Sequence, residues 1–376
     1  MDLHLEKLMQ WHRDNHQKLI KGRYINLDQI KPLIDDLPAL FKITVLGHSE
    51  EERPIHRIQM GQGRIKVLMW SQMHGNESTT TKAVFDLFKA LDRPSNEFDW
   101  VLENFTIVII PMLNPDGAEA YTRVNAANID LNRDAKRQTQ PESQVLNKVF
   151  TDFKPDYCFN LHGQRTIYGF QDTGKPSILS FLAPSSDEDR SITLWRKRSM
   201  QIITYISNQL SPDLEGSVGR YDDGFNINCT GDSYMAAGVP TILFEAGHYP
   251  DDYGREQTRA YVFSAIVLGL QGILKDDKIG ESAYFEIPEH QKCYFDIILR
   301  NSQGDDLAIQ YEELLESNRV VFMPKVAQIG SLEYSYGHKE VQIAEPMIVN
   351  DIGEQIQIGD VLMGLGEGSS FAIAPQ

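Results

Sequence analysis

The chain has 376 residues, of which 41% are hydrophobic, and it carries a formal net charge of −17. This composition supports a sizeable core and contains no extended disordered segment. So negative a charge argues against a nucleic-acid partner or an anionic membrane surface, because both require basic patches that replace counterions. Single domains usually stop near about 250 to 300 residues, so we expect one large domain and a smaller companion.

The N-terminal region, residues 1–40, is expected to form a helical segment of its own, with helices near 1–22 and 26–40. It opens charged and amphipathic, without the apolar stretch of a secretory signal. Three widely spaced cysteines imply no disulfide framework, and no apolar stretch is long enough to span a bilayer. We therefore expect a cytoplasmic protein without a membrane partner, and its oligomeric state stays open.

Strands and helices alternate from residue 41 to about residue 275. This alternation predicts an α/β domain in which helices flank a mixed β-sheet. Ranges 78–91 and 191–210 have the pattern of long helices, and the apolar range 261–274 is typical of a core helix. Short apolar runs at 65–70, 157–161 and 239–244 are typical of buried strands.

The first polar cluster, His74 and Glu77, directly follows the apolar run 65–70. A histidine nitrogen and a carboxylate three positions apart can converge on one metal ion at a strand tip. Zinc takes such ligands tetrahedrally and keeps a water site when the protein supplies three. H-x-x-E alone is common, however, and two solvated loop residues are the plainer interpretation.

Between residues 114 and 134 lies a polar stretch that begins with a turn-forming sequence, Asn114-Pro115-Asp116-Gly117. Arg123, Asn132 and Arg133 follow. The planar guanidinium of arginine matches a carboxylate through two hydrogen bonds, so this stretch can clamp a carboxylate or polarise a carbonyl. The alternative is a polar loop whose arginines pair with surface acids.

Two further polar residues end apolar runs. His162 follows the run 157–161, and Glu245 follows the run 239–244. His162 would complete a His-Glu-His ligand set, and a strand-end carboxylate suits a general base that acts on metal-activated water. Taken alone, each is equally a structural histidine or a solvated carboxylate.

From residue 280 to residue 376 the pattern changes to a smaller β-rich domain. Phe295, Ile297 and Leu299 alternate with polar residues, as in a half-buried strand. Ranges 319–323, 340–343 and 355–365 continue as short β segments. No catalytic set occurs here, so packing, oligomerisation or restricted access to the active site is the expected role.

Taken together, the ordered set H-x-x-E, N-P-D-G, R-x-N-A-x-x-x-D-L-N-R, strand-then-His and strand-then-Glu resembles the zinc carboxypeptidase family of the pancreatic carboxypeptidase A type, especially its bacterial branches. The resemblance covers roughly residues 40–275. Each motif is weak, but their ordered combination is specific.

The resemblance implies that His74, Glu77 and His162 bind one zinc ion. It also implies that Glu245 is the general base and acid, and that Asp130 orients His74 by accepting its second ring N–H. Two imidazoles and one carboxylate suit zinc among the divalent metals.

The resemblance further implies that Arg123 stabilises the developing oxyanion, while Asn132 and Arg133 hold the terminal carboxylate of the substrate. Asp134 stands where many relatives have a second asparagine, and its charge is expected to weaken or redirect that clamp. Tyr221 lies close to the position of the family's substrate-covering tyrosine, though not in register.

The position that often sets side-chain preference in relatives corresponds to Gly231, next to Asp232. Glycine offers neither charge nor bulk, which argues against a dedicated basic or acidic pocket.

Three functions therefore compete. The first is a zinc metallocarboxypeptidase that hydrolyses the C-terminal amide bond of peptides. The second is an N-acyl amino acid deacylase of the aspartoacylase and succinylglutamate desuccinylase type, which shares the metal site. The third is a binding module that has lost metal chemistry, although no ligand or base is missing.

Overall fold

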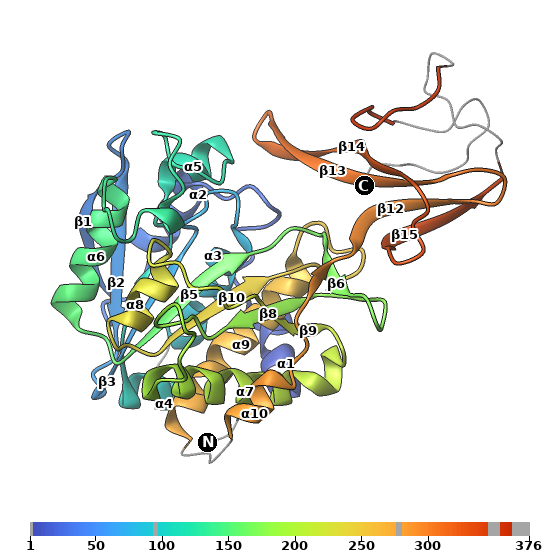
Figure 1. Ribbon diagram of the computed structural model, residues 1–376. Helices are drawn as coiled ribbons and strands as arrows, with labels where there is room; N and C mark the ends of the chain where they lie inside the picture. Colours follow the sequence, from blue (N-terminus) through green and yellow to red (C-terminus); the bar gives the residue numbers. More distant parts are fainter. Residues whose placement is uncertain (1–2, 93–96, 276–279, 345–353, 363–376) are drawn as a thin grey trace.

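The computed structural model describes residues 3–92, 97–275, 280–344 and 354–362. Its main feature is an eight-stranded mixed sheet, the central sheet (Figure 1). In spatial order, its strands are β1 (Lys42–His48), β2 (Pro54–Met60), β4 (Phe105–Ile110), β3 (Ile65–Ser71), β5 (Tyr157–Gly163), β10 (Thr241–Ala246), β8 (Leu179–Leu182) and β9 (Val218–Arg220).

Helices flank this sheet. In chain order they are α1 (Leu5–Asn15), α2 (Leu27–Asp35), α3 (Thr79–Leu91), α4 (Asp99–Asn104), α5 (Pro115–Ala120), the short 3₁₀ helix η1 (Leu131–Arg133), α6 (Pro141–Phe153), α7 (Leu194–Leu214), α8 (Thr230–Ala236), α9 (Glu256–Leu274) and α10 (Glu281–Phe285). Among the described residues, no helix combines the length and apolarity needed to cross a membrane.

The sheet separates two apolar clusters. Val67 and Met69 of β3 belong to the larger cluster with α1, α3, α7 and α9, whereas Leu68 and Trp70 belong to the smaller one with α6 and α8. Successive side chains of a strand point to opposite faces, so an uninterrupted apolar run fits a strand that is buried on both sides. This is why residues 67–70 of this run are all apolar.

Three parallel neighbours, β3, β5 and β10, lie at the centre of the sheet. Glu245 on β10 is in register with His162 on β5, and His74 follows the end of β3. Parallel strands deliver their carboxyl ends to one edge, where ligands of open α/β sheets usually bind. The topology therefore gathers the polar residues that end the three apolar runs.

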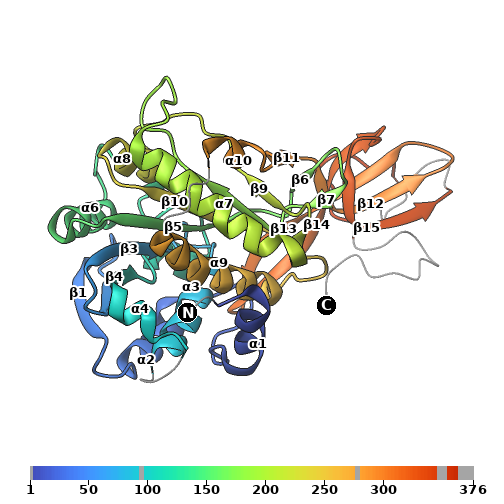
Figure 2. The same ribbon diagram turned by 90° about the horizontal axis from the view of Figure 1, so that it is seen from below.

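A second sheet, sheet C, lies beside the main body (Figures 1 and 2). Its order is β14 (Arg319–Gly330), β13 (Asp306–Glu316), β12 (Tyr294–Asn301) and β15 (Tyr336–Ile343). A small sheet of β11 (Gln291–Lys292), β6 (Tyr168–Phe170) and β7 (Lys175–Pro176) is also present. The expected fold, a mixed sheet flanked by helices plus a β-rich region, is confirmed. The boundaries 1–40, 41–275 and 280–376 stay a prediction.

Some local predictions for the C-terminal region were wrong. β13 was not predicted, because Glu312 and Glu313 interrupt its apolar pattern. β12 is buried on both faces rather than one, since Asp296 and Ile298 are also buried. In place of a strand at 355–365, described residues 354–362 contain isolated bridge residues, of which Val361 pairs with Lys325, and residues 363–365 lie outside the described part.

Candidate metal centre

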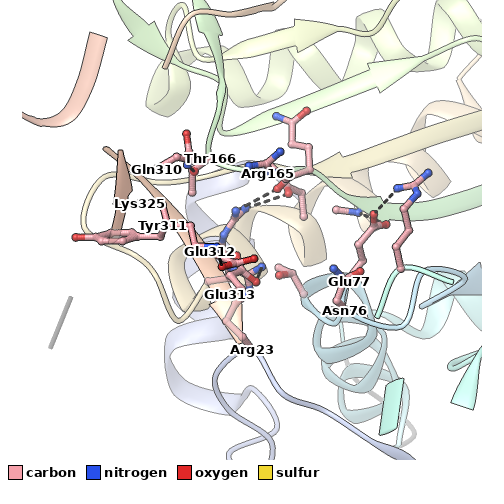
Figure 3. Close-up of a pocket in the computed structure, with 16 residues that line it drawn as sticks. Arg23, Asn76, Glu77, Arg165, Thr166, Gln310, Tyr311, Glu312, Glu313 and Lys325 are labelled. Carbon is pink, nitrogen blue, oxygen red and sulfur yellow. Dashed lines mark hydrogen bonds and ion pairs between the residues drawn. The ribbon is translucent and has the colours of Figure 1, made fainter. Parts of the chain in front are cut away.

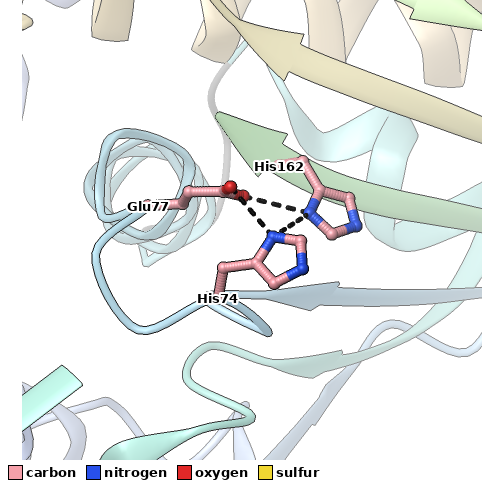
Figure 4. Close-up of side chains that lie close together, drawn as sticks. All are labelled: His74, Glu77 and His162. Atoms are coloured by element: carbon pink, nitrogen blue, oxygen red, sulfur yellow. Dashed lines mark hydrogen bonds and ion pairs between the residues drawn. The ribbon is translucent and has the colours of Figure 1, made fainter. Parts of the chain in front are cut away.

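His74, Glu77 and His162 converge at the carboxyl edge of the central sheet (Figure 4). The Nδ1 atom of His74 lies 2.8 Å from one carboxylate oxygen of Glu77, and the Nδ1 atom of His162 lies 3.0 Å from the other. The two Nδ1 atoms are 3.2 Å apart. Both histidines are buried and come from different strand ends, so only the fold brings the set together.

These residues fit a metal ion by the chemistry of their donors. One ligand atom from each side chain can be chosen so that all lie within 4.8 Å of one another. Two imidazole nitrogens and a carboxylate form a common three-ligand set of catalytic zinc. The observed Nδ1–Nδ1 approach aims two nitrogen atoms at the same point, as coordination requires.

A second layer of contacts holds His74. Its Nε2 atom lies 3.1 Å from Oδ1 of Asp130, so the carboxylate orients the ring and leaves Nδ1 for a metal. Asp130 also accepts a hydrogen bond from the backbone N–H of Asn132. The resemblance assigned this orienting role to Asp130, and the geometry agrees with that assignment.

The N-P-D-G sequence supports the ligand loop. Asn114 begins helix α5 by accepting a hydrogen bond from the Gly117 N–H, with Pro115 in the first helical position, so the predicted turn is a short helix. A Cβ atom on Gly75 would lie 1.9 Å from the carbonyl carbon of Gly117. Only glycine permits this close approach between the H-x-x-E loop and α5.

The ligands shift one another's pKa values. Burial favours the neutral carboxyl of Glu77, but His74 and His162 outweigh it and hold the pKa of Glu77 below its ordinary value. Burial lowers the pKa of His162, whereas Glu77 and Asp130 overcome burial and raise the pKa of His74. A negative carboxylate and a neutral His162 are the forms that bind a cation.

Glu245, the predicted general base, lines a cavity of about 340 Å³ beside the ligands. One of its carboxylate oxygens is buried without a hydrogen-bond partner. Burial, followed by repulsion from Glu77, raises the pKa of Glu245 well above its ordinary value. A carboxyl group with an elevated pKa and an open acceptor atom can take and return a proton at the site.

Arg123 also contacts the candidate ligand set. Its Nε atom donates to Asp130 at 3.1 Å, and its Nη1 atom lies 3.5 Å from Glu77. About half of the side chain is exposed, so part of the guanidinium faces the cavity. The Arg123 guanidinium is therefore in a position to stabilise negative charge that develops on a substrate oxygen.

Arg133 also lines this cavity, and its guanidinium donates to Cys229 Sγ at 3.2 Å. The side-chain oxygen of Asn132 accepts from the Thr230 N–H at 3.0 Å. Asp134 is buried, and its carboxylate accepts hydrogen bonds from Thr139 and Gln140; its effect on the clamp stays a prediction.

Tyr221 lies in the cavity wall, and its hydroxyl donates to the Tyr168 hydroxyl at 2.8 Å. Gly231 and Asp232 lie there too. Burial raises the pKa of Asp232 to about 7, although backbone N–H groups oppose the shift. An acidic group therefore does line this cavity, a feature that the glycine at position 231 did not suggest.

Two further residues were not predicted. Asn160 precedes His162 by two positions and lines the same cavity, and neither of its side-chain polar atoms has a hydrogen-bond partner in the described part of the chain. Strand periodicity, which places both side chains on one face, was the available signal. Arg165 lies in the loop after β5, where no sequence pattern marked it.

The sequence model of the zinc carboxypeptidase family matches residues 27–202, a range that contains all three ligands and Arg133. Residues 27–202 thus match a zinc carboxypeptidase domain. Tyr221 and Glu245 lie beyond the matched range, so their roles depend on their position in the fold.

Relatives that match this chain in sequence also have carboxypeptidase names. Probable carboxypeptidase 2 of Arthroderma benhamiae is 29% identical over 99 residues, which cover 26% of this chain and 19% of that protein. The match therefore spans only a minor part of that relative.

Solved structures show the same fold. A metallo-carboxypeptidase of Burkholderia cenocepacia is 20% identical and has a TM-score of 0.52, covering 64% of this chain and 66% of that one. A metallo-carboxypeptidase of Pseudomonas aeruginosa, solved with (2-guanidinoethylmercapto)succinic acid, is 18% identical with a TM-score of 0.53 and covers 66% and 69%. At such identities the likeness concerns the fold alone.

Proposed function

We propose that the protein is a zinc-dependent metallocarboxypeptidase that hydrolyses the amide bond next to the free carboxylate of a peptide. The observation that carries this proposal is the convergence of His74, Glu77 and His162, with Glu245 beside them and Arg133 in the same cavity. Metal-assisted hydrolysis at a chain end uses a metal centre, a base and a carboxylate-binding group, and these residues are candidates for all three roles.

His74, Glu77 and His162 would hold the zinc ion. When bound, zinc supplies Lewis acidity that polarises a carbonyl and lowers the pKa of water. Glu245 takes a proton from the attacking water on its unpartnered oxygen and returns it to the amide nitrogen that leaves. Arg123 stabilises the oxyanion of the tetrahedral intermediate, a contribution worth about 10² to 10³ in rate.

The cavity with Arg133 would take the residue that leaves, and we call it the leaving-side cavity. Arg133 binds the terminal carboxylate after exchanging its contact with Cys229 for the substrate, and Asn132 lies beside it. Tyr221 and Asp232 form the walls around the side chain of this residue. Fixing the carboxylate places the preceding carbonyl at the metal centre, which accounts for cleavage at the chain end.

An N-acyl amino acid deacylase is the second candidate, and one observation favours it. Sheet C contributes Gln310, Tyr311 and Lys325 to a cavity that also contains Glu77. A wall so close to the metal centre limits the space for a long peptide on the acyl side. The two functions share the reaction and differ in the size of the acyl group.

The test is mass-spectrometric analysis of products from a mixture of peptides and N-acyl amino acids, incubated with the zinc-loaded protein. Release of C-terminal residues supports the carboxypeptidase, whereas release of acyl groups from single amino acids alone would replace it with the deacylase. Glu245→Gln is the control, because it keeps the size of the side chain and removes the base. No chelator-sensitive hydrolysis of any compound would contradict both.

A further inference from the structure

A second cavity of about 430 Å³ adjoins the metal centre (Figure 3). Glu77, Arg123 and Arg165 line both this cavity and the leaving-side cavity. If the leaving residue occupies the cavity with Arg133, the acyl part of the substrate must extend into the second one. We call it the acyl-side cavity.

Its outer wall comes from parts of the chain that are remote in sequence. Strands β13 and β14 contribute Glu312, Glu313 and Lys325, and Arg23 comes from the segment between α1 and α2 (Figure 3). The wall is firmly attached, because Arg23 Nη2 and Glu313 form an ion pair at 2.8 Å, and Tyr121 donates to the same carboxylate. Sheet C thus lines the acyl-side cavity.

The carboxylates of this cavity are already paired. Glu313 accepts from Arg23, Glu312 forms an ion pair with Lys325 at 2.5 Å, and Glu77 belongs to the metal centre. Glu313 also attracts Arg255 electrostatically, so a single carboxylate serves two buried guanidinium groups.

Two arginines of the same cavity form no direct ion pair with a described carboxylate. Arg165 is exposed and forms no hydrogen bond or ion pair within the described part of the chain. Arg255 is 1% exposed, and its guanidinium donates to the backbone carbonyls of Ala246 and Gln164, at 3.1 Å each. Among the described residues, its Nε atom, like Nη1 of Arg23, is buried without a hydrogen-bond partner.

We propose that the acyl-side cavity binds a carboxylate carried by the acyl part of the substrate, with Arg165 as its direct partner. This inference rests on the proposed function for the direction in which the substrate lies. The carboxylate belongs either to an acidic residue that precedes the scissile bond or to a dicarboxylic acyl group on a single amino acid. Both sources present the same group to the same wall.

The physical reason is the excess of positive charge over carboxylates in this wall. A buried guanidinium that shares its counter-ion with a second arginine is costly, and a carboxylate that enters the cavity offsets part of that cost for Arg255. Arg165 can move because nothing holds its side chain, so it can close on the carboxylate with a bidentate contact. The net charge of the chain is −17, so this positive wall is a local feature rather than a general one.

The test measures binding to the zinc-loaded Glu245→Gln variant, in which hydrolysis does not interfere. Isothermal titration compares acetyl-Glu-X with acetyl-Gln-X, and succinyl-X with its monoamide, where X is the same C-terminal residue throughout. We expect the acidic member of at least one pair to bind about tenfold more tightly, the effect of one charge-assisted hydrogen bond. Equal binding within both pairs, or tighter binding of the amides, would overturn the proposal.

Arg165→Gln, added to this background, should lose most of the difference between acid and amide. Arg64→Gln is the matched control, since Arg64 is exposed and precedes β3, whereas the metal centre follows β3. Seven strand residues place the two ends about 20 Å apart. A preference that persists in the Arg165 variant, or that falls equally in the Arg64 variant, would contradict the assignment.

Hydrolysis by the wild-type protein separates this inference from the proposed function. If the acids bind more tightly but no compound is cleaved, the proposed reaction is wrong and the anion site remains. If compounds are cleaved without any preference for acids, the reaction holds and the anion site is wrong. The pair that shows the preference identifies the source of the carboxylate.

Discussion

The two cavities that meet at the metal centre are built in different ways. The leaving-side cavity is formed by strand ends of the central sheet and by residues of the loops and short helices that follow them, such as Arg133 and Asp232. The acyl-side cavity needs sheet C and the N-terminal segment to complete its wall. The residues proposed for the reaction therefore come from the central sheet and its loops. The proposed choice of acyl group depends on sheet C and the N-terminal segment, which are far from these residues in sequence.

The largest expected effect is on the leaving side. Replacing Glu245 by Gln should lower kcat by about 10⁴-fold, at the upper end for a general acid–base group, because Glu245 serves both proton transfers. KM should change little, since the variant keeps the shape of the cavity. Steady-state kinetics with a cleaved peptide test this, and a loss below about tenfold would remove Glu245 from the reaction.

The next effect concerns the attachment of the N-terminal segment that carries Arg23. Buried Asp86 accepts hydrogen bonds from Arg259 at 2.6 and 2.7 Å and lies 3.0 Å from Nε2 of His12. Asp86→Asn leaves these groups without their carboxylate, so it should lower the free energy of unfolding by about 3 to 5 kcal/mol. Denaturant unfolding at pH 7 measures it, with exposed Asp35→Asn as the control.

The difference in stability between the wild-type protein and Asp86→Asn should also depend on pH. Burial opposes ionisation of Asp86, but His12 and Arg259 overcome it and lower the pKa of Asp86 below its unfolded value. This carboxylate therefore stabilises the fold above about pH 4 and loses that contribution as the pH falls through its lowered pKa. The difference between wild type and Asp86→Asn should shrink below pH 4. A difference that grows there would show that the sign is wrong.

A smaller effect separates binding from chemistry on the leaving side. Arg133→Gln should lower kcat/KM by about 10²-fold, mainly through KM, because a charge-assisted contact to the terminal carboxylate is lost. Arg137→Gln, an exposed arginine four residues later, should leave both constants unchanged. If the two variants behave alike, the carboxylate clamp lies elsewhere.

The smallest effect concerns Asp232, whose pKa is raised to about 7. As the pH rises from 6 to 8 this group ionises, so kcat/KM for a peptide ending in lysine should rise severalfold relative to one ending in methionine. The ratio of the two kcat/KM values does not depend on the titration of Glu245, because Glu245 acts on both substrates. In Asp232→Asn this ratio should no longer change with pH. If the ratio still rises with pH in the variant, Asp232 is not the group responsible.

The sequence predicted those parts of the site that depend on short-range patterns. Each apolar run ended in a polar residue, and the parallel arrangement of β3, β5 and β10 carried His74, His162 and Glu245 to one edge. Their catalytic roles stay predictions. Asn160 was within reach of the same reasoning, because it lies on the same face of β5 as His162.

The acyl-side wall was beyond prediction for a physical reason. Arg23 and Glu313 are far apart in the chain, and no local period records that a folded chain will pair them. β13 itself was missed because Glu313 serves this contact and Glu312 pairs with Lys325, so neither continues the apolar alternation. The hydrogen bonds that Asp134 accepts from Thr139 were also outside what the sequence indicated, because the pattern does not show which way a loop side chain points.

The most direct test of the account is a zinc titration of metal-free protein, with release of the C-terminal residue from a cleaved peptide followed at each step. We expect activity to rise in proportion to added zinc, to reach its plateau at one equivalent per chain, and to be absent throughout from His162→Ala. Hydrolysis that is independent of zinc, or that persists in His162→Ala, would contradict a metal centre at His74, Glu77 and His162.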